Sequence, residues 1–214
     1  MQAQRNKLIP KYKYFLFLFT IILFVSCTKE SDTPVEPKNE TTLDKNEANS
    51  AFTYLNKVRQ NPSAYSLEIG VDLSSVAPRQ TLVWNDILQK VAEDKAYDMA
   101  SRDYFSHQTP EGYGINYFMN KAGYTMPSEW LKDPSANNFE SIAAAYKTGV
   151  VITGIDLVRQ MIVDKDVPDL GHRKHLLGID TWNANMKEIG VGFARNPKTK
   201  YQNYICVIIA KHQN

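Results

Sequence analysis

The sequence predicts an α+β domain, a three-layer α-β-α sandwich in which helices cover both faces of a central antiparallel sheet. Two apolar segments near the C-terminus, Ile189–Ala194 and Tyr204–Ala210, flank a polar stretch at residues 195–200, which is the pattern of a hairpin. The second segment is apolar at every position. A strand with one face in water would alternate, so this one should be covered on both faces. Amphipathic segments earlier in the chain supply the covering helices.

The elements before the hairpin follow from spacing and from start and stop signals. Asp44 and Glu47 have the spacing of a capping box, and Asn61-Pro62 ends the helix that they begin. Asn85 begins a second helix that runs to about Asp103. The remaining predicted elements are a short helix at 115–122, a strand at 139–146, a helix at 155–163 and a helical turn at 172–177. Together they predict one domain over residues 44–214.

Composition and charge exclude several classes of protein. Among 214 residues, 43% are hydrophobic and 22% are charged, as in an ordinary globular protein. Residues 1–26 contain four basic side chains and no acidic one, so the remainder has 21 basic against 23 acidic side chains. A slightly acidic domain without a basic stripe is not expected to bind nucleic acid. Two cysteines are too few for a disulfide scaffold.

The N-terminal 26 residues have the pattern of a secretory signal peptide. The basic residues precede twelve apolar or neutral residues, Tyr14–Val25, which as a helix would span about 18 Å, less than the ~30 Å hydrocarbon core of a bilayer. Phe24-Val-Ser-Cys27 then resembles a bacterial lipobox, in which the cysteine becomes the lipidated first residue. We therefore expect a protein attached through Cys27 to the outer membrane or cell surface. Residues 27–43 are rich in Pro, Glu, Asn and Thr and should form a disordered tether.

Three polar residues are candidates for a functional site. His107 and His172 lie in Gly-flanked loop segments, where imidazoles can bind metals or move protons. Glu140 is a single acid within an apolar strand, and a buried acid needs a partner. By themselves these residues also fit a simpler interpretation, in which they are polar loop residues and a hydrogen-bonded glutamate.

The order of the local sequences favours a site. Ser106-His107…Gly112, Phe139-Glu-Ser-Ile-Ala143, Gly171-His-Arg-Lys-His-Leu-Leu177 and Glu188-Ile-Gly-Val-Gly-Phe-Ala194 resemble, in that order, the signature segments of the CAP superfamily, also called SCP domains. Among the branches of this superfamily, the bacterial branch resembles this sequence more than the eukaryotic members do. Asn56-x-x-Arg59 and Leu82-x-Trp84-Asn85 also fit, and the resemblance covers residues 48–211.

The resemblance implies an α-β-α sandwich with a cleft lined by two histidines and two acids. His107, His172 and Glu140 would be three of these residues, and either Asp164 or Asp166 the fourth. The resemblance assigns no role to His175, which should be structural or exposed. The usual Gly-Glu-Asn is here Phe139-Glu140-Ser141, and Cys206 has no disulfide partner if Cys27 is lipidated.

Three functions are compatible with this cleft. We expect a monomeric binding protein whose ligand is a divalent metal such as zinc, a lipid or a component of the cell envelope, with His107, His172 and Glu140 as the metal ligands. A metal-dependent hydrolase could use the same residues. A structural or adhesion module with a vestigial cleft is the third alternative. Ser106 lacks the Gly-x-Ser-x-Gly setting of a nucleophile and Cys206 should be buried, so acyl-enzyme chemistry has little support.

Overall fold

The computed structural model describes residues 40–211. The predicted signal peptide, Cys27 and most of the predicted tether lie outside the described residues. Within the described part, none of the helices has both the length and the apolar character needed to cross a membrane.

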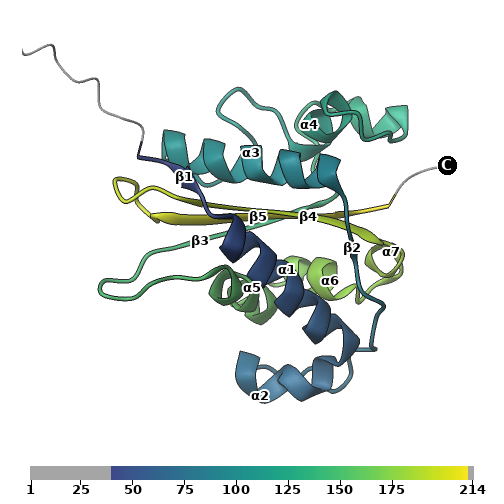
Figure 1. Cartoon of the computed structure of the whole chain (residues 1–214). Helices are drawn as coiled ribbons and strands as arrows, with labels where there is room; N and C mark the ends of the chain where they lie inside the picture. Colours follow the sequence, from purple (N-terminus) through teal and green to yellow (C-terminus); the bar gives the residue numbers. More distant parts are fainter. Residues whose placement is uncertain (1–39, 212–214) are drawn as a thin grey trace, which may run out of the picture. The chain divides into compact units, whose positions relative to one another are not determined.

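A central sheet organises the domain (Figure 1). Its main path runs β1 (Thr42–Leu43), β4 (Glu188–Arg195), β5 (Asn203–Ala210) and β3 (Glu140–Ala145), with every neighbouring pair antiparallel. A short strand, β2 (Val83–Trp84), pairs in parallel with β4. The folded part therefore begins earlier than the sequence predicted, because Thr42 and Leu43 belong to the sheet rather than to a tether.

Helices cover both faces of the sheet, so the predicted α+β sandwich is confirmed. One face carries α3 (Asp86–Arg102) and α4 (Ile115–Lys121), and the other carries α1 (Lys45–Gln60), α5 (Gly154–Val163) and α6 (Gly171–Leu177) (Figure 1). Between them β5 is buried at all eight positions, and the prediction that the apolar run Tyr204–Ala210 is covered on both faces is confirmed. Short helices α2 (Ser66–Ile69) and α7 (Thr181–Ala184) and two 3-10 turns, Pro62–Tyr65 and Ser128–Leu131, complete the described chain.

Side-chain caps explain where the long helices begin. The Asp44 carboxylate accepts the Glu47 N–H at 3.2 Å and starts α1 where the sequence placed it. Asn85 accepts the N–H groups of both Ile87 and Leu88 and starts α3. Each cap satisfies backbone donors that a helix leaves unpaired at its first turn.

Two glycines let α3 lie directly on β4. A Cβ added at Gly190 would lie 2.1 Å from the carbonyl carbon of Leu88, and one added at Gly192 would lie 2.1 Å from the carbonyl oxygen of Ala92. No side chain fits at either position unless the helix moves. The Gly-x-Gly of this strand is therefore a requirement of packing between the two elements.

Candidate functional site

His107 lies on the loop that leaves α3, and a buried lysine holds that loop. The Lys95 ammonium donates to the carbonyl oxygens of Ser106 and His107 at 2.7 and 3.2 Å. Lys95 itself is only 5% exposed, although it lies on a helix. A buried ammonium must be hydrogen-bonded. Lys95 therefore fixes the backbone from which the His107 ring projects.

Glu140 is the first residue of β3, and its side chain is fully buried. Its Oε2 lies 2.7 Å from Nδ1 of His107, while its Oε1 lies 3.5 Å from the buried Cys206 thiol. Asn137 Oδ1 accepts the Glu140 N–H, and Asn137 Nδ2 lies 2.8 Å from the same His107 nitrogen. A buried carboxylate needs hydrogen-bond partners, which here are His107 and Cys206, while Asn137 contacts the Glu140 backbone and the His107 ring. In the pair with Glu140, Nδ1 of neutral His107 is the donor, which leaves Nε2 as the acceptor nitrogen.

His172 forms a second pair of the same kind with Asp164. Nδ1 of His172 lies 2.7 Å from Oδ1 of Asp164, whose side chain is 1% exposed. Asp164 ends α5 in the left-handed conformation, and its Oδ2 accepts the Arg173 N–H at the start of α6. Asp166, the other acid left open by the sequence, is exposed. The structure therefore brings Asp164 to the histidine.

The two pairs face each other across one cleft. The His107 and His172 rings are nearly parallel, 26° apart in plane, with centroids separated by 6.4 Å. The cleft has a volume of about 510 Å³ and is lined by Phe105, Ser106, His107, Gln108, Ile142 and His172. The rings are partly exposed, with 43% of the His107 side chain and 26% of the His172 side chain accessible, while both carboxylates lie behind them. Groups from four separate segments thus meet at one site.

His175 and Cys206 are structural neighbours of this site. The Nδ1 atom of His175 lies 2.7 Å from the Ser141 hydroxyl, and its Nε2 atom lies 3.4 Å from the Ile209 carbonyl oxygen. Burial lowers the pKa of His175 to about 4. Burial also raises the pKa of the Cys206 thiol well above its ordinary value, and the Glu140 charge raises it further. His175 is therefore structural rather than exposed, and Cys206 is a buried thiol as the sequence predicted.

Sequence reasoning missed two residues that support the cleft. Asn137 was assigned only to a loop, although an asparagine just before a strand can hydrogen-bond to the backbone two or three residues later, as it does with Phe139 and Glu140. Nothing in the sequence marked Lys95 as a buried residue, because a lysine on a helix is ordinarily solvated.

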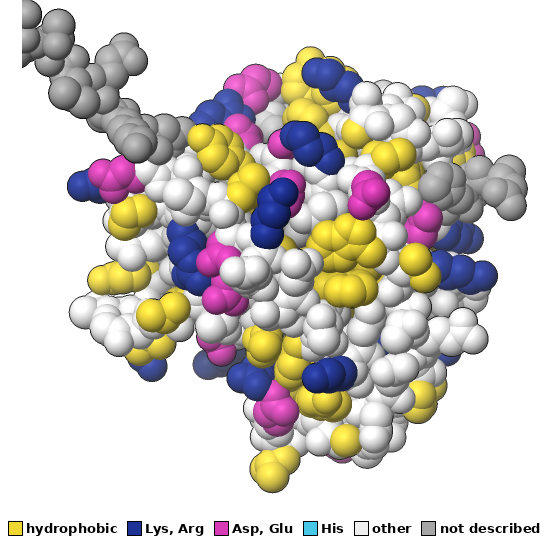
Figure 2. All heavy atoms as spheres, viewed as in Figure 1, with side chains coloured by type: hydrophobic (Ala, Val, Ile, Leu, Met, Phe, Trp, Pro, Cys, Tyr) yellow, Lys and Arg dark blue, Asp and Glu magenta, His cyan; other side chains and the backbone are white. Residues whose placement is uncertain are grey.

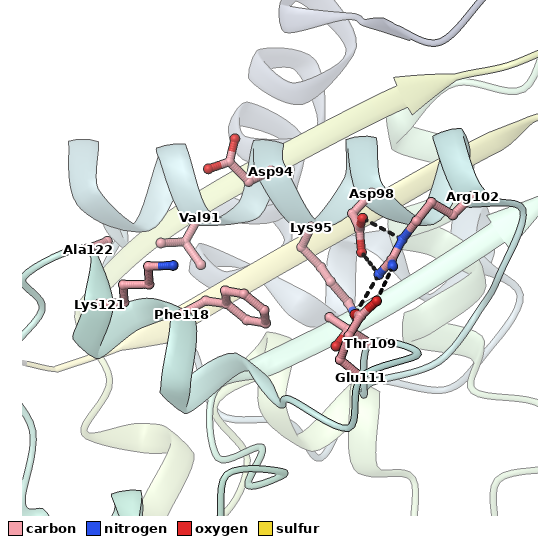
Figure 3. Close-up of a pocket in the computed structure, with 10 residues that line it drawn as sticks. All are labelled: Val91, Asp94, Lys95, Asp98, Arg102, Thr109, Glu111, Phe118, Lys121 and Ala122. Carbon is pink, nitrogen blue, oxygen red and sulfur yellow. Dashed lines mark hydrogen bonds and ion pairs between the residues drawn. The ribbon is translucent and has the colours of Figure 1, made fainter. Parts of the chain in front are cut away.

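A second cavity lies on the other side of the His107 loop, between α3 and α4. It has a volume of about 560 Å³ and is lined by Val91, Asp94, Lys95, Asp98, Arg102, Thr109, Glu111, Phe118, Lys121 and Ala122. Figure 3 shows Arg102 bound by the carboxylates of Asp98 and Glu111 at one end, with Phe118 projecting between the two helices. Lys95 thus contacts this cavity with its stem and the His107 loop with its ammonium.

Two solved structures are similar to this chain. Among solved structures, an outer surface protein from Borrelia burgdorferi matches with a TM-score of 0.50 and 15% sequence identity, covering 80% of this chain and 98% of that protein. An extracellular protein containing an SCP domain from Bacillus anthracis matches with a TM-score of 0.46 and 19% identity, covering 78% of this chain and 41% of that one.

At the level of sequence, no curated protein matches significantly. A family model does match, and it spans residues 52–209, which include both histidines and both carboxylates of the cleft. The chain belongs to the CAP family, the cysteine-rich secretory protein family.

Proposed function

We propose that this protein is an exported, lipid-anchored CAP domain that binds a divalent cation, such as zinc, between His107 and His172. The observation that supports the cation is the pair of histidine–carboxylate contacts on opposite sides of one cleft. The observation that supports the anchor is the lipobox-like Phe24-Val-Ser-Cys27 after a short apolar run.

The chemistry of the donor set fits a divalent cation. Each histidine has its Nδ1 against a carboxylate, so Nε2 is the nitrogen left to bind a ligand. Metal-binding histidines commonly have this arrangement, in which the carboxylate orients the ring and raises its basicity. When both imidazoles are neutral, the two pairs together carry a charge of about −2. A divalent cation neutralises that charge.

The number of protein donors sets the strength of binding. Within residues 40–211, the structure has no group of three or more His, Cys, Asp or Glu side chains placed to hold one metal ion. Glu140, which the sequence suggested as a ligand, contacts His107 and is better placed to orient it. Structural zinc sites use four protein ligands and catalytic ones use three. With two, we expect weaker binding, completed by water or by donor atoms of a bound molecule, and we place binding ahead of hydrolysis.

Titration calorimetry with ZnCl₂ tests the cation site. We expect one ion per chain for the parent, and His107→Ala and His172→Ala should each abolish most of the affinity. The melting temperature of the parent should rise with zinc, because a ligand that binds only the folded state stabilises it, while the two variants should not respond. Acid should weaken binding, since a protonated imidazole cannot be a ligand.

Two neighbouring aspartates provide a matched control. Asp164→Asn removes the charge behind His172, and loss of such a partner typically costs 10- to 100-fold in metal affinity, so a loss of about that size is expected. Asp166→Asn changes the charge by the same amount two residues away, at an exposed position that also has positive φ, and should have little effect. Equal zinc binding by the parent and both histidine variants would exclude this site, as would equal effects of the two aspartate substitutions.

A further inference from the structure

One end of the sheet carries uncovered apolar side chains and lysines. The pairing register places the end of β3 at Ala145 and the end of β4 at Arg195 on either side of Asn203, the first residue of β5. Thr42 of β1 pairs with Arg195, so the described chain also enters the domain at this end. Figure 1 shows the β3–α5 loop, the β4–β5 turn and β1 together on the left of the view.

The β3–α5 loop exposes the apolar part of this end. Val151 is 74% exposed, Tyr146 51% and Val150 47%, so no described residue covers them well. Phe105 is 41% exposed, and its ring lies 5.5 Å from that of Tyr201 in the neighbouring turn. In Figure 2 hydrophobic side chains project from the left of the molecule, where Figure 1 places this loop.

Three exposed lysines lie at this end, where Arg195 is paired with the carboxylates of Asp44 and Glu47. Lys147 lies in the loop and Lys198 and Lys200 lie in the turn, all exposed. Of the acids nearby, Glu40 lies 3.7 Å from Lys198, and Asp103 accepts hydrogen bonds from the Lys200 N–H and the Tyr204 hydroxyl. Exposed apolar side chains surrounded by lysines are the composition of surfaces that bind the interface of anionic membranes.

The proposed anchor precedes the described domain by a short stretch of chain. Cys27 precedes Glu40 by thirteen residues, which span at most about 45 Å when extended and about 20 Å as a flexible coil. The described domain is about 40 Å across for its size. A bilayer anchored at Cys27 is therefore within reach of the end at which the chain enters the domain.

We infer that the β3–α5 loop and the β4–β5 turn form a membrane-docking surface, with Tyr146, Val150 and Val151 entering the lipid interface and Lys147, Lys198 and Lys200 contacting anionic headgroups. This inference rests on the proposed lipid anchor. Because Phe105 lies beside Tyr201 and also lines the histidine cleft, docking brings one wall of the cleft next to the bilayer.

A site-specific fluorescent probe on vesicles tests the surface. The protein begins at residue 28, which retains all described residues and hence the whole core, and a hexahistidine tag replaces Cys27. Vesicles of phosphatidylethanolamine and phosphatidylglycerol with some nickel-chelating lipid hold the tag. Val151→Cys carries an NBD fluorophore, while Cys206 is buried and should not react. The matched control is Leu67→Cys in α2, because Leu67 is 96% exposed but lies away from this end.

We expect NBD emission at position 151 to rise several-fold and shift to the blue on the vesicles, with quenching by spin-labelled lipid, and emission at position 67 to stay unchanged. Replacing Lys147, Lys198 and Lys200 by Gln, or using phosphatidylcholine in place of phosphatidylglycerol, should reduce the rise at position 151. Equal responses at the two positions would overturn the inference. A probe at 151 that is already shielded without vesicles would also overturn it, since residues 28–39 would then cover the loop.

The tag makes this result independent of lipidation. If Cys27 is not lipidated, fractionation of cells expressing the full chain fails to find it in the membrane, and the proposed anchor is wrong. The vesicle experiment still reports whether this end of the domain enters a bilayer.

Discussion

The buried His175 should make the stability of the domain fall in acid. The pKa of this imidazole is lowered to about 4 by burial, against about 6.5 in an unfolded chain. Between these values the unfolded state binds a proton that the folded state does not, so stability decreases as pH falls from about 6.5 to about 4. The Ser141 hydroxyl and the Ile209 carbonyl contact the ring, and the charges of His172, Arg59 and Asp180 act on it from nearby.

The size of the effect follows from the shift. A shift of about 2.5 units corresponds to about 3 kcal/mol once pH is below both values, and to about 2 kcal/mol between pH 7 and pH 4.5. The side chain is almost fully buried, so solvent screening reduces this value little. The charges on the paired carboxylates contribute a separate acid dependence, which a comparison of two variants removes.

The experiment measures the free energy of unfolding of the parent and of His175→Gln in urea at pH 7 and at pH 4.5. Tryptophan fluorescence follows unfolding, and a chelator is present. Gln cannot titrate, so the parent should lose about 2 kcal/mol more than the variant between the two pH values. The variant should be less stable than the parent at pH 7, because an amide fills the imidazole site poorly. This offset is the same at both pH values, so it does not affect the comparison of the two losses. Equal losses in parent and variant would refute the reasoning.

Two further predictions concern packing and anchoring. Gly192→Ala should lower the free energy of unfolding, measured in urea, by about 3 kcal/mol, because the new methyl group collides with the α3 backbone. The control is Gly171→Ala, whose Cβ would lie 3.6 Å from its nearest neighbour and which should change that free energy by less than about 0.5 kcal/mol. Similar effects of the two substitutions would contradict the packing argument. Cys27→Ser should move the full chain from the membrane fraction to the soluble fraction or stall its processing, and a normally processed, membrane-bound variant would count against lipidation.

Periodicity and capping residues were sufficient to predict the main elements. The apolar run at Tyr204–Ala210 predicted a strand covered on both faces, and Asp44 and Asn85 predicted the starts of two helices, because these signals are local. The two-residue strands β1 and β2 were missed, since strands of this length have no periodicity and exist only through pairing with β4.

The site depended on the family resemblance and on contacts that no local pattern encodes. His107, Glu140 and His172 were named from the order of the motifs, but the choice between Asp164 and Asp166 required the conformation at the end of α5. Asp164 is the residue that ends this helix in the left-handed conformation, and its carboxylate therefore reaches both His172 and the first turn of α6. Lys95 was beyond sequence reasoning, because its partners are backbone carbonyls eleven and twelve residues away.

The position of β5 in the sheet has a consequence for how the chain folds. This strand is made last, yet it lies between β4 and β3, and β3 pairs with nothing else along the main path of the described sheet. Until β5 is made, β3 therefore lacks the strand that joins it to β4, and non-local pairings of this kind form slowly. The order of the strands therefore delays completion of the sheet until residues 203–210 are available.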